Sequence, residues 1–377
     1  MKIRLLLPTI FAVLLCACGG NDPLTPDPGP YVPPDPNPPS VYKYGLRELA
    51  RANRLPLGAA FTYGEYVWDD SLKVVLKRDF EYVTFGNEMK HDGIVRPSGG
   101  YDFQTADTMV GWAKDCGSQL FGHTLGWHAQ QQTEFLNNLI DGAADDDAAA
   151  AAVRAAHADF VDRMVEHFDA YAWDVVNEVF AEDGSWRTWS ITQPNYHVFL
   201  WGDYYQGGTR AFVDAAFRSA REALEKYGRQ ADLYINDYNL EWNSVKLDAL
   251  CRYAEGNPDV TGVSSQMHCS TDLSEAGIRS MLERMVKTGK KVRISELDVP
   301  QGNNPDRKQA DVIVSIFRLY LEIVPEAQRG GITFWGVSDK NTWLGKGKYP
   351  LLYDARYNRK DSYRALHAFL LERSGLE

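Results

Sequence analysis

Short, β-rich apolar runs alternate with longer amphipathic runs from about residue 41 onward. The β-rich runs predict eight strands, at residues 57–60, 82–84, 119–124, 172–176, 232–236, 263–268, 292–296 and 331–335. Between them lie helical patterns such as residues 147–168, whose acidic start suits the positive end of a helix dipole. Strands that alternate with helices predict parallel pairing. Eight such units predict an α/β fold, the (β/α)8 TIM barrel, as a single catalytic domain over residues 41–377.

Polar side chains follow the apolar runs of seven of these eight strands, from the second to the eighth. Because all strands of such a barrel point the same way, their carboxyl ends meet at one mouth. We therefore expect one site to gather amide, imidazole, carboxylate, ammonium and indole groups. The candidates, in chain order, are Asn87, Lys90, His123, Trp127, Asn177, Glu178, Gln266, His268, Glu296, Asp298, Trp335 and Trp343.

Two of these candidates are glutamates on strands nearly opposite each other in the ring. Glu178 ends the run WDVVNE and Glu296 lies in ISELD. Cleavage of a glycosidic bond by acid and base requires a pair of carboxyl groups, one that keeps its proton and one that stays ionised. Asp298 faces the same way as Glu296, and His268 lies on the neighbouring strand. We expect Glu296, His268 and Asp298 to form a hydrogen-bonded chain that keeps Glu296 ionised.

Each of these residues also has a plainer interpretation when it is taken alone. A single glutamate is most often a solvated or ion-paired residue, His268 could be a core histidine, and Trp335 and Trp343 could be packing residues. Their joint placement at the ends of different strands favours a site. His123 and His128 lack the spacing of a metal-binding motif, and the chain has no GxSxG motif, so we expect neither a metal, a cofactor nor a serine nucleophile.

The first forty residues differ from the rest in composition. Residues 1–17 combine Lys2 and Arg4 with an apolar run too short to span a bilayer, which is typical of a secretory signal. The small residues before Cys18 indicate a lipoprotein signal peptide, although an ordinary signal peptide remains an alternative. Residues 18–40 would then be a lipidated Cys18 and a proline-rich linker. We expect secretion across the inner membrane and a lipid tether, on the outer membrane at its periplasmic face or the cell surface.

Net charge and cysteine content limit the possible partners and disulfide bridges. The 377 residues carry a formal net charge of −11, which argues against a nucleic-acid partner, and nothing indicates a protein partner. Beyond the leader, the cysteines are Cys116, Cys251 and Cys269. Three free buried thiols are the favoured interpretation, with a bridge between Cys251 and Cys269 as the alternative.

Several long motifs, in order along the chain, resemble those of glycoside hydrolase family 10, the endo-β-1,4-xylanases. They are TFGNEMKH, FGHTLGWH, WDVVNE, YINDYN, SQMH, ISELD, TFWGVSD and PLLYDARYNRKDSY, and the resemblance runs from about residue 41 to 371. It implies a (β/α)8 barrel that hydrolyses xylan with retention, by double displacement. It also implies a carboxyl separation of about 5 to 5.5 Å, the spacing of retaining enzymes.

Roles follow from the matching positions. The resemblance implies that Glu178 is the general acid/base and Glu296 the nucleophile, and that Asn177, Gln266 and His268 hold the sugar 2-hydroxyl and the nucleophile. It implies that the sugars on the non-reducing side of the cut are lined by Asn87, Lys90, His123 and Trp127. It further implies that Trp335 and Trp343 cover the faces of the sugar rings.

Some positions depart from the family pattern. Gly86 and His91 stand where the family commonly has Glu and Trp, so the binding of the second sugar on the non-reducing side is in question. The segment 182–209 is longer than the pattern and could be either extra substrate surface or simple loop packing. Two other functions stay open: a glycan-binding lipoprotein without chemistry, and hydrolysis of a glucan, which the aromatic walls Trp335 and Trp343 would disfavour sterically.

Overall fold

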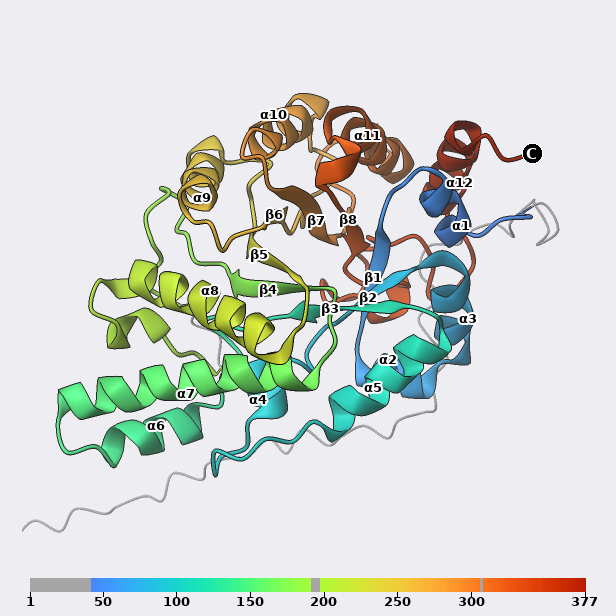
Figure 1. The fold of residues 1–377 in the computed structure, drawn as a ribbon. Coiled ribbons are helices and arrows are strands. Elements are labelled where there is room, and N and C mark those ends of the chain that lie inside the picture. Colours follow the sequence, from blue (N-terminus) through green and yellow to red (C-terminus); the bar gives the residue numbers. More distant parts are fainter. Residues whose placement is uncertain (1–41, 191–196, 306–307) are drawn as a thin grey trace, which may run out of the picture.

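Eight parallel strands form a closed barrel in chain order, each paired with the next and β8 paired with β1 (Figure 1). The computed structural model describes residues 42–190, 197–305 and 308–377. The strands are β1 Leu57–Phe61, β2 Tyr82–Phe85, β3 Gln119–His123, β4 Ala172–Asn177, β5 Asp232–Asp237, β6 Gly262–Ser265, β7 Lys291–Leu297 and β8 Arg329–Phe334. The predicted barrel and all eight predicted strands are confirmed.

Helices surround the barrel and connect successive strands (Figure 1). The α-helices are α1 Leu46–Ala52, α2 Tyr63–Trp68, α3 Asp70–Asp79, α4 His91–Ile94, α5 Gln104–Asp115, α6 Thr133–Asp141, α7 Asp146–His167, α8 Gly208–Tyr227, α9 Ser244–Gly256, α10 Glu275–Val286, α11 Gln309–Ile323 and α12 Asp361–Ser374. Helix α7 matches the predicted helix within one residue at each end, and the Asp145 carboxylate caps it by accepting the N–H of Ala148.

The sixth strand is shorter than predicted. It ends at Ser265, whereas the apolar pattern predicts a strand to His268. Met267 has a φ of 56°, which breaks the ladder, and His268 then makes an isolated parallel bridge with Asp298. The break turns the end of this segment toward β7, where the site forms.

The barrel interior is filled by side chains. A Cβ at Gly262 of β6 would lie 2.2 Å from the ring of Tyr234 on β5, so the phenol ring occupies the space that the glycine leaves. Beside Tyr234, with ring centroids 5.7 Å apart, lies Phe121. The buried Arg293 guanidinium lies 3.5 Å from the centroid of Phe121 and donates to Thr333 Oγ1 at 2.7 Å. Its two terminal nitrogens are therefore both bonded, since Nη1 also donates to the Tyr171 hydroxyl at 2.9 Å, and the barrel is a packed core.

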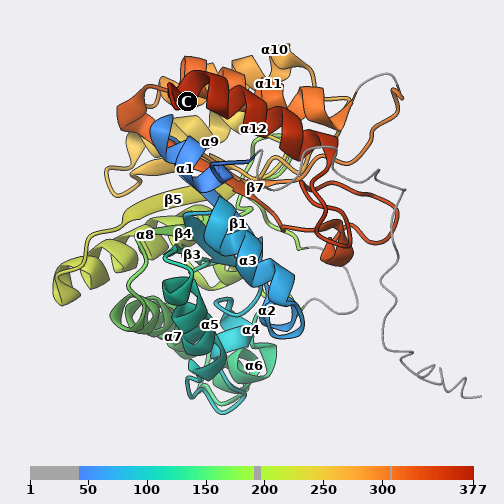
Figure 2. The ribbon, with the colours of Figure 1, turned by 90° about the vertical axis from the view of Figure 1, so that its right-hand side faces the viewer.

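The loops that follow the strands extend from one side of the barrel, as the orange and red segments before α11 and α12 show in Figure 2. Cys116, Cys251 and Cys269 are buried and unbridged, which confirms the favoured interpretation. The expected signal peptide, Cys18 and the linker to residue 40 lie outside the described residues. Among the helices of the described ranges, none is long and apolar enough to cross a membrane.

Candidate active site

A cavity of about 560 Å³ opens at the carboxyl ends of the strands. Every candidate from the sequence lines it except Asp298, which lies directly behind it. The expected residues in its wall are Asn87, Lys90, His123, Trp127, Asn177, Glu178, Gln266, His268, Glu296, Trp335 and Trp343. Further wall residues include Thr62, Glu65, Gly86, Gln130, Tyr238, Asn239 and Asn341. The convergence predicted from the strand ends is therefore seen in the structure.

Glu296, near the end of β7, is buried and bonded on both carboxylate oxygens. Asn236 Nδ2, from the end of β5, donates to Glu296 Oε1 at 2.8 Å. His268 Nε2 lies 3.2 Å from Glu296 Oε2, and His268 Nδ1 lies 2.8 Å from Asp298 Oδ2. The expected chain of Glu296, His268 and Asp298 is thus present. Trp343 Nε1 donates to the same Asp298 oxygen at 2.7 Å, which fixes the far end of the chain.

The charges within this hydrogen-bonded chain of side chains favour the ionised form of Glu296. Burial alone would raise the pKa of Glu296, but the His268 hydrogen bond and the nearby positive groups, among them Lys90, outweigh it and lower that pKa below its usual value. Burial would likewise lower the pKa of His268, but the charges and hydrogen bonds of Asp298 and Glu296 raise it to about 10. At neutral pH the site therefore holds an imidazolium between two carboxylates.

Glu178 lies one residue beyond β4 and has different surroundings. Its backbone φ is 57°, an unusual value for a residue with a side chain, and its carbonyl oxygen accepts from Arg187 Nε at 2.6 Å. Its carboxyl group contacts amides: Gln266 Nε2 lies 3.0 Å from Glu178 Oε1. His128 Nε2 lies 3.8 Å from Glu178 Oε2, and burial lowers the pKa of His128 to about 3, so this imidazole is neutral.

Side-chain amides connect the two carboxyl groups. Gln266 Nε2 donates to Asn177 Oδ1 at 3.1 Å as well as to Glu178, and Asn236 Nδ2 donates to Asn177 Oδ1 at 2.9 Å as well as to Glu296. These three amides are buried. This buried hydrogen-bonded network holds both glutamates in fixed positions at one cavity. The arrangement has the parts needed for paired-carboxyl acid and base chemistry.

Comparison with known proteins identifies the relatives of this fold. The family model described as "Glycosyl hydrolase family 10" matches residues 45–369. The chain belongs to this family. An endo-β-1,4-xylanase from Cellvibrio japonicus is 31% identical over 85% of this chain and 56% of that protein. The chain thus spans about half the length of that curated relative.

Solved structures agree with the family assignment. The crystal structure of native xylanase 10B from Thermotoga maritima is similar with a TM-score of 0.73 and 29% identity, over 88% of this chain and 99% of that one. Xylanase 10B from Thermotoga petrophila in complex with xylobiose has the same TM-score and 28% identity, over 88% and 98%. The expected family and fold are therefore confirmed.

Lys90 and Asn87, which follow β2, meet through a residue of the next loop. Lys90 Nζ donates to Gln130 Oε1 at 2.6 Å, and Gln130 Nε2 donates to Asn87 Oδ1 at 3.2 Å. Lys90 Nζ also lies 4.7 Å from the centroid of a Trp127 ring. Gln130 stands in the segment AQQQTEF, directly after His128, and this segment thus adds a polar contact to the wall of the cavity.

His123 and Trp335 form the wall between β3 and β8. His123 Nδ1 lies 2.8 Å from Asp174 Oδ2, and both side chains are buried. Burial raises the pKa of Asp174, with the His123 contact acting against this shift. The Trp335 ring lies 5.4 Å from the His123 ring and 6.3 Å from the His268 ring, so it bridges the two imidazoles.

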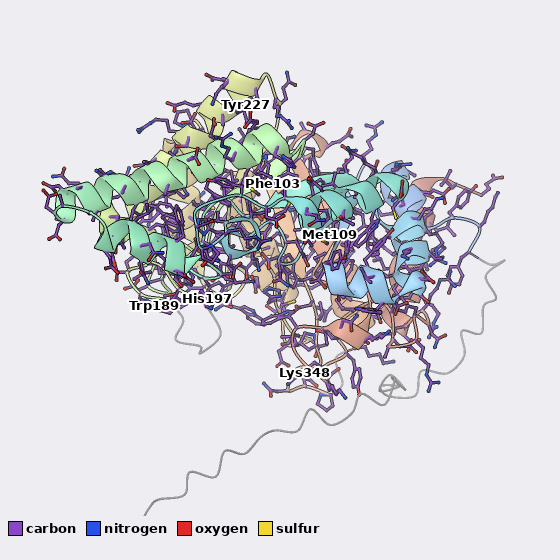
Figure 3. All side chains as sticks on the ribbon, turned by 90° about the horizontal axis from the view of Figure 1, so that it is seen from below. Phe103, Met109, Trp189, His197, Tyr227 and Lys348 are labelled. Atoms are coloured by element: carbon purple, nitrogen blue, oxygen red, sulfur yellow. The ribbon has the colours of Figure 1, made fainter. Side chains whose placement is uncertain are left out.

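The described part of the long segment 182–209 packs beneath Glu178. The Arg187 guanidinium lies 4.4 Å from the Trp189 ring centroid, and its Nη2 donates to the hydroxyl of Tyr238 at 2.8 Å. Trp189 is 47% exposed, and Figure 3 labels it together with His197 beyond the gap. Arg187 thus has a packing role, while a substrate contact by Trp189 stays a prediction.

Sequence reasoning missed several residues of the site. Asn236, Gln130 and Arg187 contact the expected residues but were assigned no role. The sequence did contain a signal for Asn236, because this residue ends the predicted fifth strand, in the NDYN motif, as the other candidates end theirs. Gln130 and Arg187 lie in loops, where apolar periodicity gives no register, and only the folded chain shows which group they reach.

Proposed function

We propose that this chain is a retaining endo-β-1,4-xylanase that hydrolyses internal bonds of xylan by double displacement. The observation that carries the proposal is the contrast at the cavity: Glu296 is held by an imidazolium, and the opposite Glu178 contacts amides and a neutral imidazole. Membership in glycosyl hydrolase family 10 and relatives named endo-xylanases support the substrate class.

The mechanism assigns one role to each carboxyl group. Glu178 gives its proton to the leaving glycosidic oxygen while Glu296 attacks the anomeric carbon, which forms a covalent xylosyl ester and releases the leaving sugar. Glu178, now a carboxylate, takes a proton from water. The resulting hydroxide attacks the same carbon, breaks the ester and restores Glu296. Two inversions give net retention.

The surrounding residues position these two groups. His268 lowers the pKa of Glu296, so its attacking oxygen is unprotonated. Asn177 and Gln266 hold the amide network near the sugar 2-hydroxyl, where hydrogen bonds strengthen in the transition state. Trp335 and Trp343 offer aromatic faces to sugar rings, and Asn87, Lys90, His123 and Trp127 line the non-reducing side.

Product analysis on soluble xylan tests this function. We expect short xylo-oligosaccharides whose first-formed anomer, followed by proton NMR, is β; an early α anomer would exclude retention. Rates on mixed-linkage glucan measured in parallel separate a xylanase from a glucanase, because glucose carries a hydroxymethyl group that Trp335 and Trp343 would obstruct. A barrel that binds xylan without releasing any sugar would instead be a glycan-binding protein.

We further propose that Cys18 carries a lipid after removal of residues 1–17, and that residues 18–40 space the barrel from the outer membrane. The support is the sequence pattern alone. Metabolic labelling with an alkyne palmitate analogue should mark the wild-type chain and leave Cys18→Ser unlabelled. Labelling of Cys18→Ser equal to wild type would contradict the tether, and protease treatment of whole cells would report which membrane face carries the barrel.

A further inference from the structure

One end of the cavity has an unusual wall. It is formed by Thr62 and Glu65, at the start of α2, and by Gly86 and Asn87, just beyond β2. We call these four residues the β1–β2 end. Gly86 lacks the Glu side chain that the family pattern commonly supplies at this position, so a sugar that reaches this end would lack that acceptor.

Glu65 holds the start of α2 with only one of its carboxylate oxygens. Its Oε2 accepts the N–H of Thr62 at 2.6 Å and the Thr62 hydroxyl at 3.0 Å, which completes a capping box. Within residues 42–190, 197–305 and 308–377, no donor bonds the other oxygen, Oε1. Glu65 therefore has a fixed position and a free acceptor beside the cavity.

The neighbouring Glu88 is not equivalent. Its Oε1 accepts the N–H of Tyr63 at 2.7 Å and its Oε2 the N–H of Asn87 at 3.2 Å, so both oxygens are used by the backbone. Glu88 also does not line the cavity. Of the two carboxylates near Gly86, only Glu65 presents an unused oxygen.

Gly86 and Glu65 are linked through Thr62. A Cβ at position 86 would lie 3.0 Å from Thr62 Cγ2, closer than ordinary packing allows. A longer side chain at 86 would therefore push on the residue that holds Glu65. The glycine keeps Thr62 in place, and Thr62 keeps Glu65 in place.

We propose that Glu65 Oε1 accepts a hydroxyl of the second sugar on the non-reducing side of the cut, in place of the side chain absent at Gly86. The proposal rests on the function proposed above. Ring hydroxyls are hydrogen-bond donors, and a carboxylate is their strongest acceptor among side chains. Asn87, beside Gly86, gives the same end an exposed amide. Glu65 then helps to set how much binding the second sugar contributes.

Two aryl glycosides isolate this contact. 4-Nitrophenyl β-xylobioside places a second sugar at the β1–β2 end, and 4-nitrophenyl β-xyloside has none. We expect Glu65→Gln to lower the ratio of kcat/KM values, xylobioside over xyloside, by about tenfold, because it replaces a charged acceptor. Glutamine still caps the helix, so the melting temperature should not change. Glu65→Ala should lower the ratio at least as far.

The matched control is Glu48→Gln. Glu48 is the capping-box carboxylate of α1, where it accepts the N–H of Gly45 at 2.8 Å, and it does not line the cavity. Glu48→Gln should leave the ratio at the wild-type value.

The double variant Glu65→Ala, Gly86→Glu tests whether a carboxylate at position 86 can replace that of Glu65. It should restore part of the ratio that Glu65→Ala loses.

The outcomes separate this proposal from the proposed function. A wild-type chain without activity on xylan contradicts the function. An active wild type whose ratio is unchanged by Glu65→Gln overturns the role of Glu65 alone. Equal losses on both glycosides also overturn it, because they would mean that Glu65 acts through the fold of α2.

Discussion

The surroundings of Glu296 and of Glu178 differ in charge more than in shape. Glu296 is buried against the imidazolium of His268, with Lys90 nearby, and these positive groups lower its pKa. Among the described residues, no protonated imidazole bonds Glu178: its carboxyl group contacts Gln266 at 3.0 Å and approaches the neutral His128. Two glutamates at one cavity thus have unequal electrostatic environments.

This difference would let one residue type take the two roles that the proposed mechanism assigns. The amides of Asn177, Asn236 and Gln266 bond both carboxyl groups and cannot distinguish them. The distinction comes from His268, whose own charge depends on Asp298 behind it. In the proposed mechanism, a carboxylate outside the cavity therefore helps to determine which glutamate attacks.

The largest expected effect comes from removing the ionised partner. Glu296→Ala removes the group that forms the covalent ester in the proposed mechanism, so turnover should fall by roughly 10⁵-fold or more on every substrate. Initial rates on xylan and on 4-nitrophenyl β-xylobioside measure the loss. Retention of a tenth of the wild-type rate on either substrate would contradict the assignment of Glu296.

Glu178→Ala should discriminate between substrates. Without a proton donor, turnover of xylan should fall by about 10² to 10⁴-fold, the range for general acid catalysis. An aryl glycoside with an activated leaving group needs no proton, so formation of its ester should be largely spared. Equal losses on both substrates would mean that the roles of the two glutamates are not divided as proposed.

Removing the imidazolium should make the two environments more alike. His268→Gln keeps a polar group but loses the charge, so the pKa of Glu296 should rise because burial is no longer outweighed. The proposed mechanism requires an ionised Glu296, so the acidic limb of the kcat/KM profile should move to higher pH, and the rate at neutral pH should fall about 10²-fold.

A distant histidine serves as the control. His167 is bonded to Asp107 at 2.6 Å on the protein surface, so His167→Gln should leave the pH profile in place. An acidic limb of His268→Gln that coincides with the wild-type limb would show that His268 does not govern the ionisation of Glu296.

The fold was predictable because burial imposes a pattern. Every strand is buried on both faces, so apolar runs marked all eight of them, and their carboxyl ends located the candidates. The predicted end of β6 was wrong for a local reason, the positive φ at Met267. The pattern of apolar and polar residues does not encode this backbone conformation. The amide network and the free oxygen of Glu65 depend on distances between loops, and these arise only on folding.

The smallest effect on chemistry should come from the charges behind Glu178. Asp237 Oδ2 accepts the N–H of Phe180, two residues after Glu178, and Asp237 Oδ1 pairs with the buried Lys246 at 2.8 Å. Burial raises the pKa of Asp237 to about 6, although Lys246 acts against this. Lys246→Met leaves that carboxyl buried without its partner, so it should lower the free energy of unfolding by about 3 to 5 kcal/mol.

The pH dependence of this loss has a definite sign. Without Lys246 the folded-state pKa of Asp237 rises further above its unfolded value, so folding takes up a proton and the penalty grows as pH rises above the unfolded pKa. Urea unfolding of Lys246→Met should therefore show the largest deficit at alkaline pH and a smaller one toward pH 5. Lys226→Met, which breaks a solvent-exposed pair with Asp162, should cost far less stability than Lys246→Met. If Lys246→Met instead shifted the acidic limb of activity as His268→Gln does, the two sides of the cavity would be electrostatically coupled, and the contrast between Glu178 and Glu296 would not be local.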